Sequence, residues 1–96
     1  MHRDEILAIL RGVKRDYAEK YGILELGVFG SIARNEARQD SDVDICIKTE
    51  TPNPFALVHI KEAIEAITGR HVEIVRVRER MNPFLRERIE KEGLYV

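Results

Sequence analysis

Cysteine and tryptophan are almost absent from this sequence of 96 residues, which contains one Cys and no Trp. A lone cysteine, Cys46, cannot form a disulfide within the chain, and it cannot build a cysteine-rich zinc site. Cys46 falls in an apolar segment, so we expect it to be a small buried side chain. Because so little cysteine is typical of a reducing compartment, we expect a cytoplasmic protein.

The sequence also lacks a strong excess of either charge and any long apolar run. Its 16 Lys+Arg and 17 Asp+Glu give a formal net charge of −1, which argues against a globally basic surface and against stable DNA binding. No apolar run approaches the ~18 residues of a membrane-spanning helix. Apolar residues 6–10 are too few for a signal peptide and follow charged residues, so we expect no membrane association. The length predicts a single domain over residues 1–96.

Apolar residues repeat every three or four positions in several segments, which is the pattern of amphipathic helices. The predicted helices cover residues 4–21, 31–38, 54–68 and 83–92. Glycines are expected to end three of them, at Gly22, Gly69 and Gly93. Asn-Pro pairs are expected to begin two of them, at Asn53 and Asn82. Ser31 is suited to cap the short second helix.

Three other segments have the pattern of strands. Residues 24–29 are apolar enough for a buried strand, whereas residues 43–48 and 71–78 alternate with a period of two. In the last of these, Glu73 shares one face with Val75 and Val77. Because strands alternate with helices along the chain, the sequence predicts an α/β (α+β) fold in which helices cover a small, mixed and partly open β-sheet.

Asp42 and Asp44 stand two residues apart where a strand begins, so their side chains point to the same face. Two neighbouring carboxylates repel each other, most strongly where water is partly excluded. A divalent cation would neutralise the pair, and Mg²⁺ is suited to such a site because it takes one or two carboxylates and completes its shell with waters and substrate phosphates.

Upstream, Phe29, Gly30 and Ser31 lie at a junction between a strand and a helix. Gly30 allows a sharp turn and a close approach of the backbone to a ligand. The N–H groups that open the following helix, together with the Ser31 hydroxyl, would form a cradle for an anion. A phosphate cradle joined to a pair of carboxylates by one short helix is the arrangement expected for binding a metal–nucleotide.

Simpler interpretations of the same residues exist. Asp42 alone is consistent with a helix cap or an Asx-turn, which needs no ligand. Asp40, Asp42 and Asp44 imitate the start of a calcium loop, but Ile45 and Thr51 occupy the positions that require Gly and Glu. A P-loop is excluded because no Lys-Ser/Thr follows a glycine at the required spacing.

The segment from residue 27 to residue 47 resembles the minimal nucleotidyltransferases (MNT), which belong to the superfamily of polymerase β and the kanamycin nucleotidyltransferases. The resemblance rests on Gly30-Ser31, Ala33-Arg34 and Ser41-Asp42-Val43-Asp44, followed by apolar residues. It implies the polymerase β-like nucleotidyltransferase palm fold. The order and lengths of the other elements agree with this family.

The resemblance also implies a set of site residues. Asp42 and Asp44 would hold two Mg²⁺ ions, and the β- and γ-phosphates of the nucleotide would lie against Gly30 and Ser31. Apart from the resemblance, Arg34 is a candidate for contact with the nucleotide phosphates or with carboxylates of a partner. The family adds a third carboxylate on a neighbouring strand, which binds metal and activates the acceptor hydroxyl. In this sequence Glu73 is the acid at that place. The family usually has Asp there, and the extra methylene of Glu is the main departure from the pattern. At residue 35, Asn replaces the usual glycine.

Small members of this family are typically encoded beside a helical HEPN-type ribonuclease toxin and act as its antitoxin. The resemblance therefore implies a Mg²⁺-dependent enzyme that transfers AMP from ATP to a hydroxyl of that toxin, with tyrosine as the expected acceptor. Homo- or hetero-oligomers are consistent with this function. The alternative is a catalytically weak or inactive antitoxin that neutralises its toxin by binding alone, and Glu73 is the feature that favours it. Transfer to an antibiotic or to RNA would need a substrate domain or a basic surface that the sequence lacks.

Overall fold

The computed structural model describes residues 2–96, in which helices and strands alternate along the chain. The helices are α1 (Arg3–Tyr21), α2 (Gly30–Ala33), α3 (Pro54–Thr68) and α4 (Pro83–Glu92). The strands are β1 (Ile23–Phe29), β2 (Val43–Thr49), β3 (Val72–Arg76) and β4 (Leu94–Tyr95). Every helix and strand expected from the sequence is present, some with different bounds, and β4 is additional.

The helix ends follow the local chemistry of the sequence. Asn53 accepts a hydrogen bond from the Ala56 N–H at 3.1 Å, and Asn82 caps α4 in a similar way. Gly22 and Gly69 end α1 and α3 in the left-handed conformation, which glycine adopts without a steric penalty. Within residues 2–96, no helix combines the length and the apolar character needed to cross a bilayer.

The four strands form one mixed sheet in the order β3-β2-β1-β4. β2 pairs with β3 in parallel, whereas β1 is antiparallel to both β2 and β4. β4 lies against Gly27 and Val28, and a Cβ atom on Gly27 would lie only 2.7 Å from the Leu94 carbonyl oxygen. The absence of a side chain at Gly27 therefore allows β4 to reach the edge of the sheet. β4 was not expected because two residues are too few to show a period.

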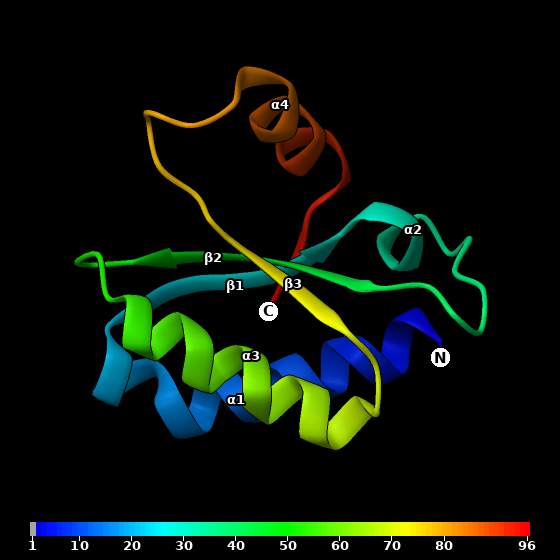
Figure 1. The fold of residues 1–96 in the computed structure, drawn as a ribbon, viewed down its shortest axis with the longest axis horizontal. Helices are drawn as coiled ribbons and strands as arrows, with labels where there is room; N and C mark the ends of the chain where they lie inside the picture. Colours follow the sequence, from blue (N-terminus) through cyan, green and yellow to red (C-terminus); the bar gives the residue numbers. More distant parts are fainter. Residues whose placement is uncertain (1) are drawn as a thin grey trace.

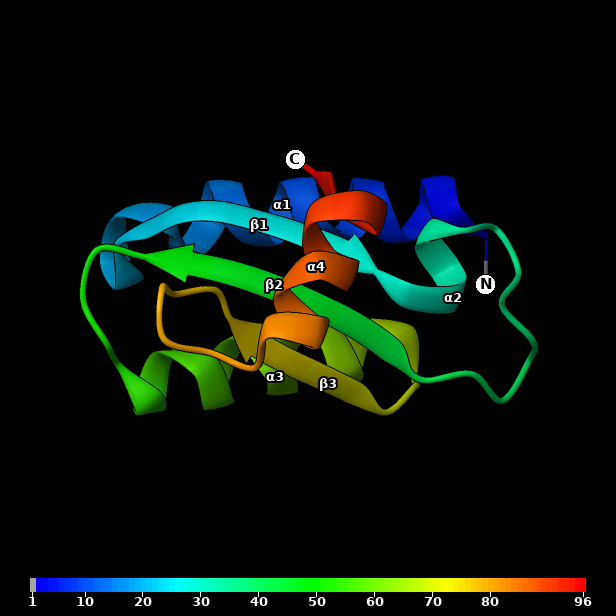
Figure 2. The same cartoon turned by 90° about the horizontal axis from the view of Figure 1, so that it is seen from above.

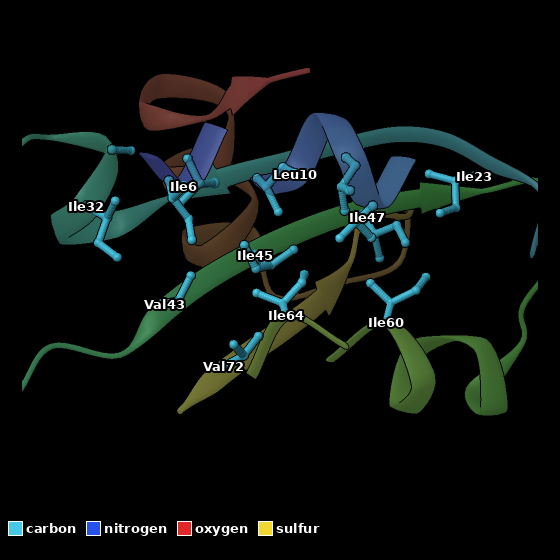
Figure 3. Close-up of a cluster of buried hydrophobic side chains, with 14 residues drawn as sticks. Ile6, Leu10, Ile23, Ile32, Val43, Ile45, Ile47, Ile60, Ile64 and Val72 are labelled. Atoms are coloured by element: carbon cyan, nitrogen blue, oxygen red, sulfur yellow. The ribbon is translucent and has the colours of Figure 1, made fainter. Parts of the chain in front are cut away.

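The larger hydrophobic core lies between one face of the sheet and the pair of helices α1 and α3 (Figures 1 and 3). α1 contributes Ile6 and Leu10, and α3 contributes Ile60 and Ile64, all of which have 0% exposure. The sheet contributes the inward residues of its strands, among them Val43, Ile45, Ile47 and Val72. Each fully buried side chain of this size stabilises the fold by about 1.5–3 kcal/mol.

A smaller cluster lies on the opposite face of the sheet, under α4 (Figures 1 and 2). Its buried members are Phe29, Cys46 and Ile89, with Leu85 of α4 and Val75 of β3 packed beside them. Cys46 is thus buried as expected. Because side chains alternate along β2, the strand that buries Val43 and Ile45 on one face presents Asp44 and Cys46 on the other. α4 therefore covers part of the face that carries Asp44.

The predicted helix over residues 31–38 was wrong in its bounds. α2 begins at Gly30, ends at Ala33, and has Phe29 rather than Ser31 at its N-cap, with no side-chain capping bond. Asn35 adopts a left-handed conformation with a φ of 60°, which stops the helix. Asn tolerates this conformation better than most residues, because its short polar side chain bonds locally.

Candidate active site

Three strands bring the candidate residues into one row across the sheet. Asp44 of β2 lies opposite Phe29 of β1 on one side and opposite Glu73 of β3 on the other. Asp42 precedes β2 by one residue and is exposed, as is Glu73. The expectation that the strand carrying Glu73 adjoins the strand carrying Asp44 is therefore confirmed.

The Asp44 carboxyl group lies in an environment that disfavours its charge. Partial burial raises its pKa above the ordinary value, and the negative charges of Asp42 and Glu73 raise it further. The positive charge of Arg88 of α4 lowers the pKa of Asp44, and it does so more strongly than either acidic neighbour raises it. Burying a carboxylate beside two other acids costs free energy, so a site with a purely structural role would not be expected to contain this arrangement.

Gly30 is the residue that allows this arrangement at the end of β1. It has a φ of +76°, where L-residues other than glycine are strained. A Cβ atom at this position would overlap Asp44 Oδ2 and would lie 3.2 Å from Asp44 Cγ. The backbone at Gly30 thus approaches the Asp44 side chain more closely than any other residue type allows. Ser31 follows directly and is half-buried.

Asp42, His71 and Glu73 form a group whose ligand atoms all lie within 4.8 Å of one another. His71 Nε2 is 2.9 Å from Glu73 Oε1, and its Nδ1 is 3.4 Å from Glu65 Oε2. The hydrogen bond with Glu73 is the main reason that the pKa of His71 is raised. In the sequence, the two-residue spacing that puts His71 on the same strand face as Glu73 is the one signal that indicates His71 as a member of this group.

These residues fit a divalent metal in part. Asp42 and Glu73 supply two exposed carboxylates at a separation that one cation can bridge, and oxygen ligands are those that Mg²⁺ prefers. Asp44 is not a member of this group, and its carboxylate lies against Gly30.

Arg34, expected at the nucleotide phosphates, lies beside carboxylates. Its Nε donates to Glu36 Oε2 at 3.2 Å, and its NH1 group donates to Glu92 Oε1 at 2.9 Å. The second oxygen of Glu92 accepts a hydrogen bond from the Gly30 N–H at 3.2 Å. Sequence reasoning missed Glu92, because it ends α4 and is separated from Gly30 by 62 positions.

The sequence has clear relatives among characterised families. Residues 10–96 match the family described as Nucleotidyltransferase domain. The protein adenylyltransferase MntA of Thermococcus cleftensis is 41% identical over 73 residues, which cover 75% of this chain and 74% of the relative. A candidate protein adenylyltransferase of Methanocaldococcus jannaschii is 34% identical over 93 residues, which cover 96% of this chain and 95% of the relative.

Solved structures show the same architecture. A minimal nucleotidyltransferase has a TM-score of 0.79 and 33% identity, and the match covers 98% of this chain and 95% of that one. A toxin–antitoxin structure with AMP-PNP has a TM-score of 0.75 and 18% identity, with 99% and 72% of the two chains covered. At that identity, the second similarity concerns the fold alone.

The mixed sheet and the row of acidic residues beside a glycine-serine turn define an enzyme of the polymerase β-like nucleotidyltransferase class. This chain belongs to the nucleotidyltransferase domain family, and within it to the minimal nucleotidyltransferases.

Proposed function

We propose that this protein transfers AMP from ATP to a tyrosine hydroxyl of a HEPN-type toxin, in a Mg²⁺-dependent reaction of the cytoplasm, and thereby acts as the antitoxin. The observation that carries the proposal is the half-buried Asp44, held between the Gly30 turn and Glu73 in a nucleotidyltransferase fold. Relatives named as protein adenylyltransferases support it. Similarly folded structures include a toxin–antitoxin pair with AMP-PNP and a tri-AMPylated HEPN toxin with its MNT antitoxin.

The turn after β1 is the proposed site of the β- and γ-phosphates. The backbone at Gly30 is open to close approach because it has no side chain, and Ser31 adds a hydroxyl donor. Arg34 adds a guanidinium group one helical turn away, and guanidinium matches phosphate in shape and charge. These three residues would orient the triphosphate so that its α-phosphorus lies over the face of the sheet that carries Asp44.

Asp42, Asp44 and Glu73 would hold two Mg²⁺ ions. When bound, such a pair of ions stabilises the attacking and the leaving oxygens of an in-line displacement. Without a cation the three carboxylates repel one another, and after burial this repulsion is the second effect that raises the pKa of Asp44. The same repulsion favours cation binding, because neutralising the charges removes it.

In the transfer itself, the acceptor oxygen forms a bond to the α-phosphorus. The bond from that phosphorus to the oxygen bridging to the β-phosphate breaks, and pyrophosphate leaves with both electrons of the broken bond. The acceptor proton passes to the Glu73 carboxylate, which is exposed and therefore accessible to a protein substrate. A protein acceptor fits this chain, because its helices and strands are used to build the sheet and cover it.

One observation favours a second candidate, in which the protein neutralises its toxin by binding without transfer. The Asp44 carboxylate lies outside the group formed by Asp42, His71 and Glu73. If nucleotide binding does not bring these acids together, the site would be weak. A misplacement of a catalytic group by about 1 Å costs roughly 10²-fold in rate.

The test is the intact mass of the neighbouring-gene product, the proposed toxin, measured after incubation with this protein, ATP and Mg²⁺. We expect a gain of one or more AMP units. Asp44→Asn should abolish the gain, whereas Asp40→Asn, which changes an exposed acid outside the group, should leave it intact. An unchanged toxin mass together with a stable complex would contradict transfer and favour neutralisation by binding.

A further inference from the structure

The C-terminal end of α4 places a carboxylate on the donors that we assign to the nucleotide phosphates. Glu92 accepts from the Gly30 N–H at 3.2 Å through one oxygen and from Arg34 at 2.9 Å through the other. Both donors therefore already have an anionic partner within the protein. The Glu92 side chain is only 22% exposed, so water weakens this interaction less than it weakens a fully exposed pair.

The charge around Arg34 is opposite to what a phosphate needs. Arg34 contacts Glu36 as well as Glu92, so one guanidinium group is shared by two carboxylates. The three groups together carry a net negative charge. A triphosphate is repelled by such a group unless a carboxylate leaves, and Glu92 is the one that also holds Gly30.

We propose that Glu92 sets the affinity of this site for the β- and γ-phosphates, because its carboxylate occupies the Gly30 and Arg34 donors until a polyphosphate displaces it. The proposal rests on the proposed function, in which these donors bind the nucleotide. A ligand that carries only an α-phosphate does not compete for them. Glu92 therefore lowers the affinity for triphosphate and for pyrophosphate relative to AMP, which favours release of the leaving group.

The structure offers the displaced carboxylate a second partner. Arg88 lies four residues before Glu92 in α4, the spacing at which side chains of a helix meet. In the described part of the chain, Arg88 is in no ion pair within 4.0 Å, although its charge acts on Asp44, and its guanidinium lies 5.7 Å from the centre of the Phe29 ring. Arg88 and Glu92 also line one surface pocket of about 330 Å³. Exchange of Glu92 from Arg34 to Arg88 would therefore give the displaced carboxylate a cationic partner, which it would share with Asp44.

The test compares ligand binding by the wild type and by Glu92→Gln, using calorimetry with Mg²⁺ present. The ligands are AMP-PNP, inorganic tripolyphosphate and AMP. Removal of the competing charge should tighten the binding of AMP-PNP and of tripolyphosphate about twofold to fivefold, the effect expected for one partly exposed ion pair. AMP binding should not change. Glu90→Gln is the matched control, because Glu90 lies on the same helix, is exposed, and pairs with Arg86.

A second variant guards against a folding defect. Glu92→Asp keeps the charge but shortens the side chain by one methylene, so it should loosen the contacts with both donors and also tighten polyphosphate binding. Unchanged or weaker tripolyphosphate binding by folded Glu92→Gln or Glu92→Asp would overturn the proposal, and weaker binding would make Glu92 a residue that positions the donors.

The outcome also separates this inference from the proposed function. If the wild type and both variants bind AMP-PNP equally, only the role of Glu92 is refuted. If none of them binds AMP-PNP or tripolyphosphate, the nucleotide site itself is refuted and the role of Glu92 with it.

Discussion

Replacement of Gly30 by alanine tests how the site is built, because it adds a single carbon where the backbone meets the Asp44 side chain. Two separate effects are expected. The first is backbone strain, since Gly30 has a φ of +76°. The second is a steric conflict, since the new Cβ would overlap Asp44 Oδ2. The first effect reduces stability, and the second displaces a candidate metal ligand.

The two effects have different magnitudes. A left-handed conformation costs an L-residue roughly 1–2 kcal/mol, and each kcal/mol lowers the melting temperature of a domain this size by about 4–8 °C. To restore ordinary contact with the new methyl group, the Asp44 carboxylate must move by roughly 1 Å. A displacement of that size costs about 10²-fold in rate. We therefore expect Gly30→Ala to be folded, less stable and nearly inactive.

Gly69→Ala is the matched control. Gly69 has a φ of +67°, close to that of Gly30, but nothing lies within 4 Å of the place of its Cβ. The control should therefore lose a similar amount of stability and retain its activity. The assays are thermal unfolding followed by circular dichroism and the rate of AMP incorporation into the toxin. If Gly69→Ala loses activity as severely as Gly30→Ala, or if Gly30→Ala keeps activity within tenfold of the wild type, the reasoning is refuted.

Three further predictions follow from the contacts. Asp44→Asn should abolish AMP transfer while leaving the melting temperature equal or higher, because it removes a half-buried charge that Asp42 repels; a lower melting temperature would contradict this. Burial raises the pKa of Tyr95 from the model-peptide value of 10.0 to about 12, so the folded protein holds this proton more tightly than the unfolded chain. The free energy of unfolding should therefore fall as the pH rises from about 10 to about 12. Urea unfolding of the wild type and of Tyr95→Phe measures this fall, and an equal fall in both proteins would refute the contribution of Tyr95. Gly27→Ala should cost about 1–3 kcal/mol of unfolding free energy, because its Cβ would lie 2.7 Å from the Leu94 carbonyl; truncation after Gly93 should remove most of that penalty in denaturant titrations.

Much of the fold could be predicted because its signals are local. The period of the apolar residues depends only on neighbours along the chain, and it placed four helices and the three longer strands. The Asn-Pro pairs at Asn53 and Asn82 marked helix starts correctly, because a cap and its bonded N–H groups lie within three residues of each other. Prediction failed where the sequence pattern of an element was short or where a single residue ended the element early. α2 ended early at the left-handed Asn35, and β4 is too short to have a period.

The sequence by itself determined which chemistry this protein carries: a glycine-serine turn, two carboxylates on one face of a strand, and the family to which that spacing belongs. Only the tertiary structure decided what surrounds them. The parallel pairing of β2 with β3 set Glu73 beside Asp44, and His71 joined Asp42 as a consequence. The packing of α4 on the sheet brought the Glu92 carboxylate to Gly30. These contacts join residues far apart in the chain, so they depend on the order of the strands and on the packing of helices, which no local pattern encodes.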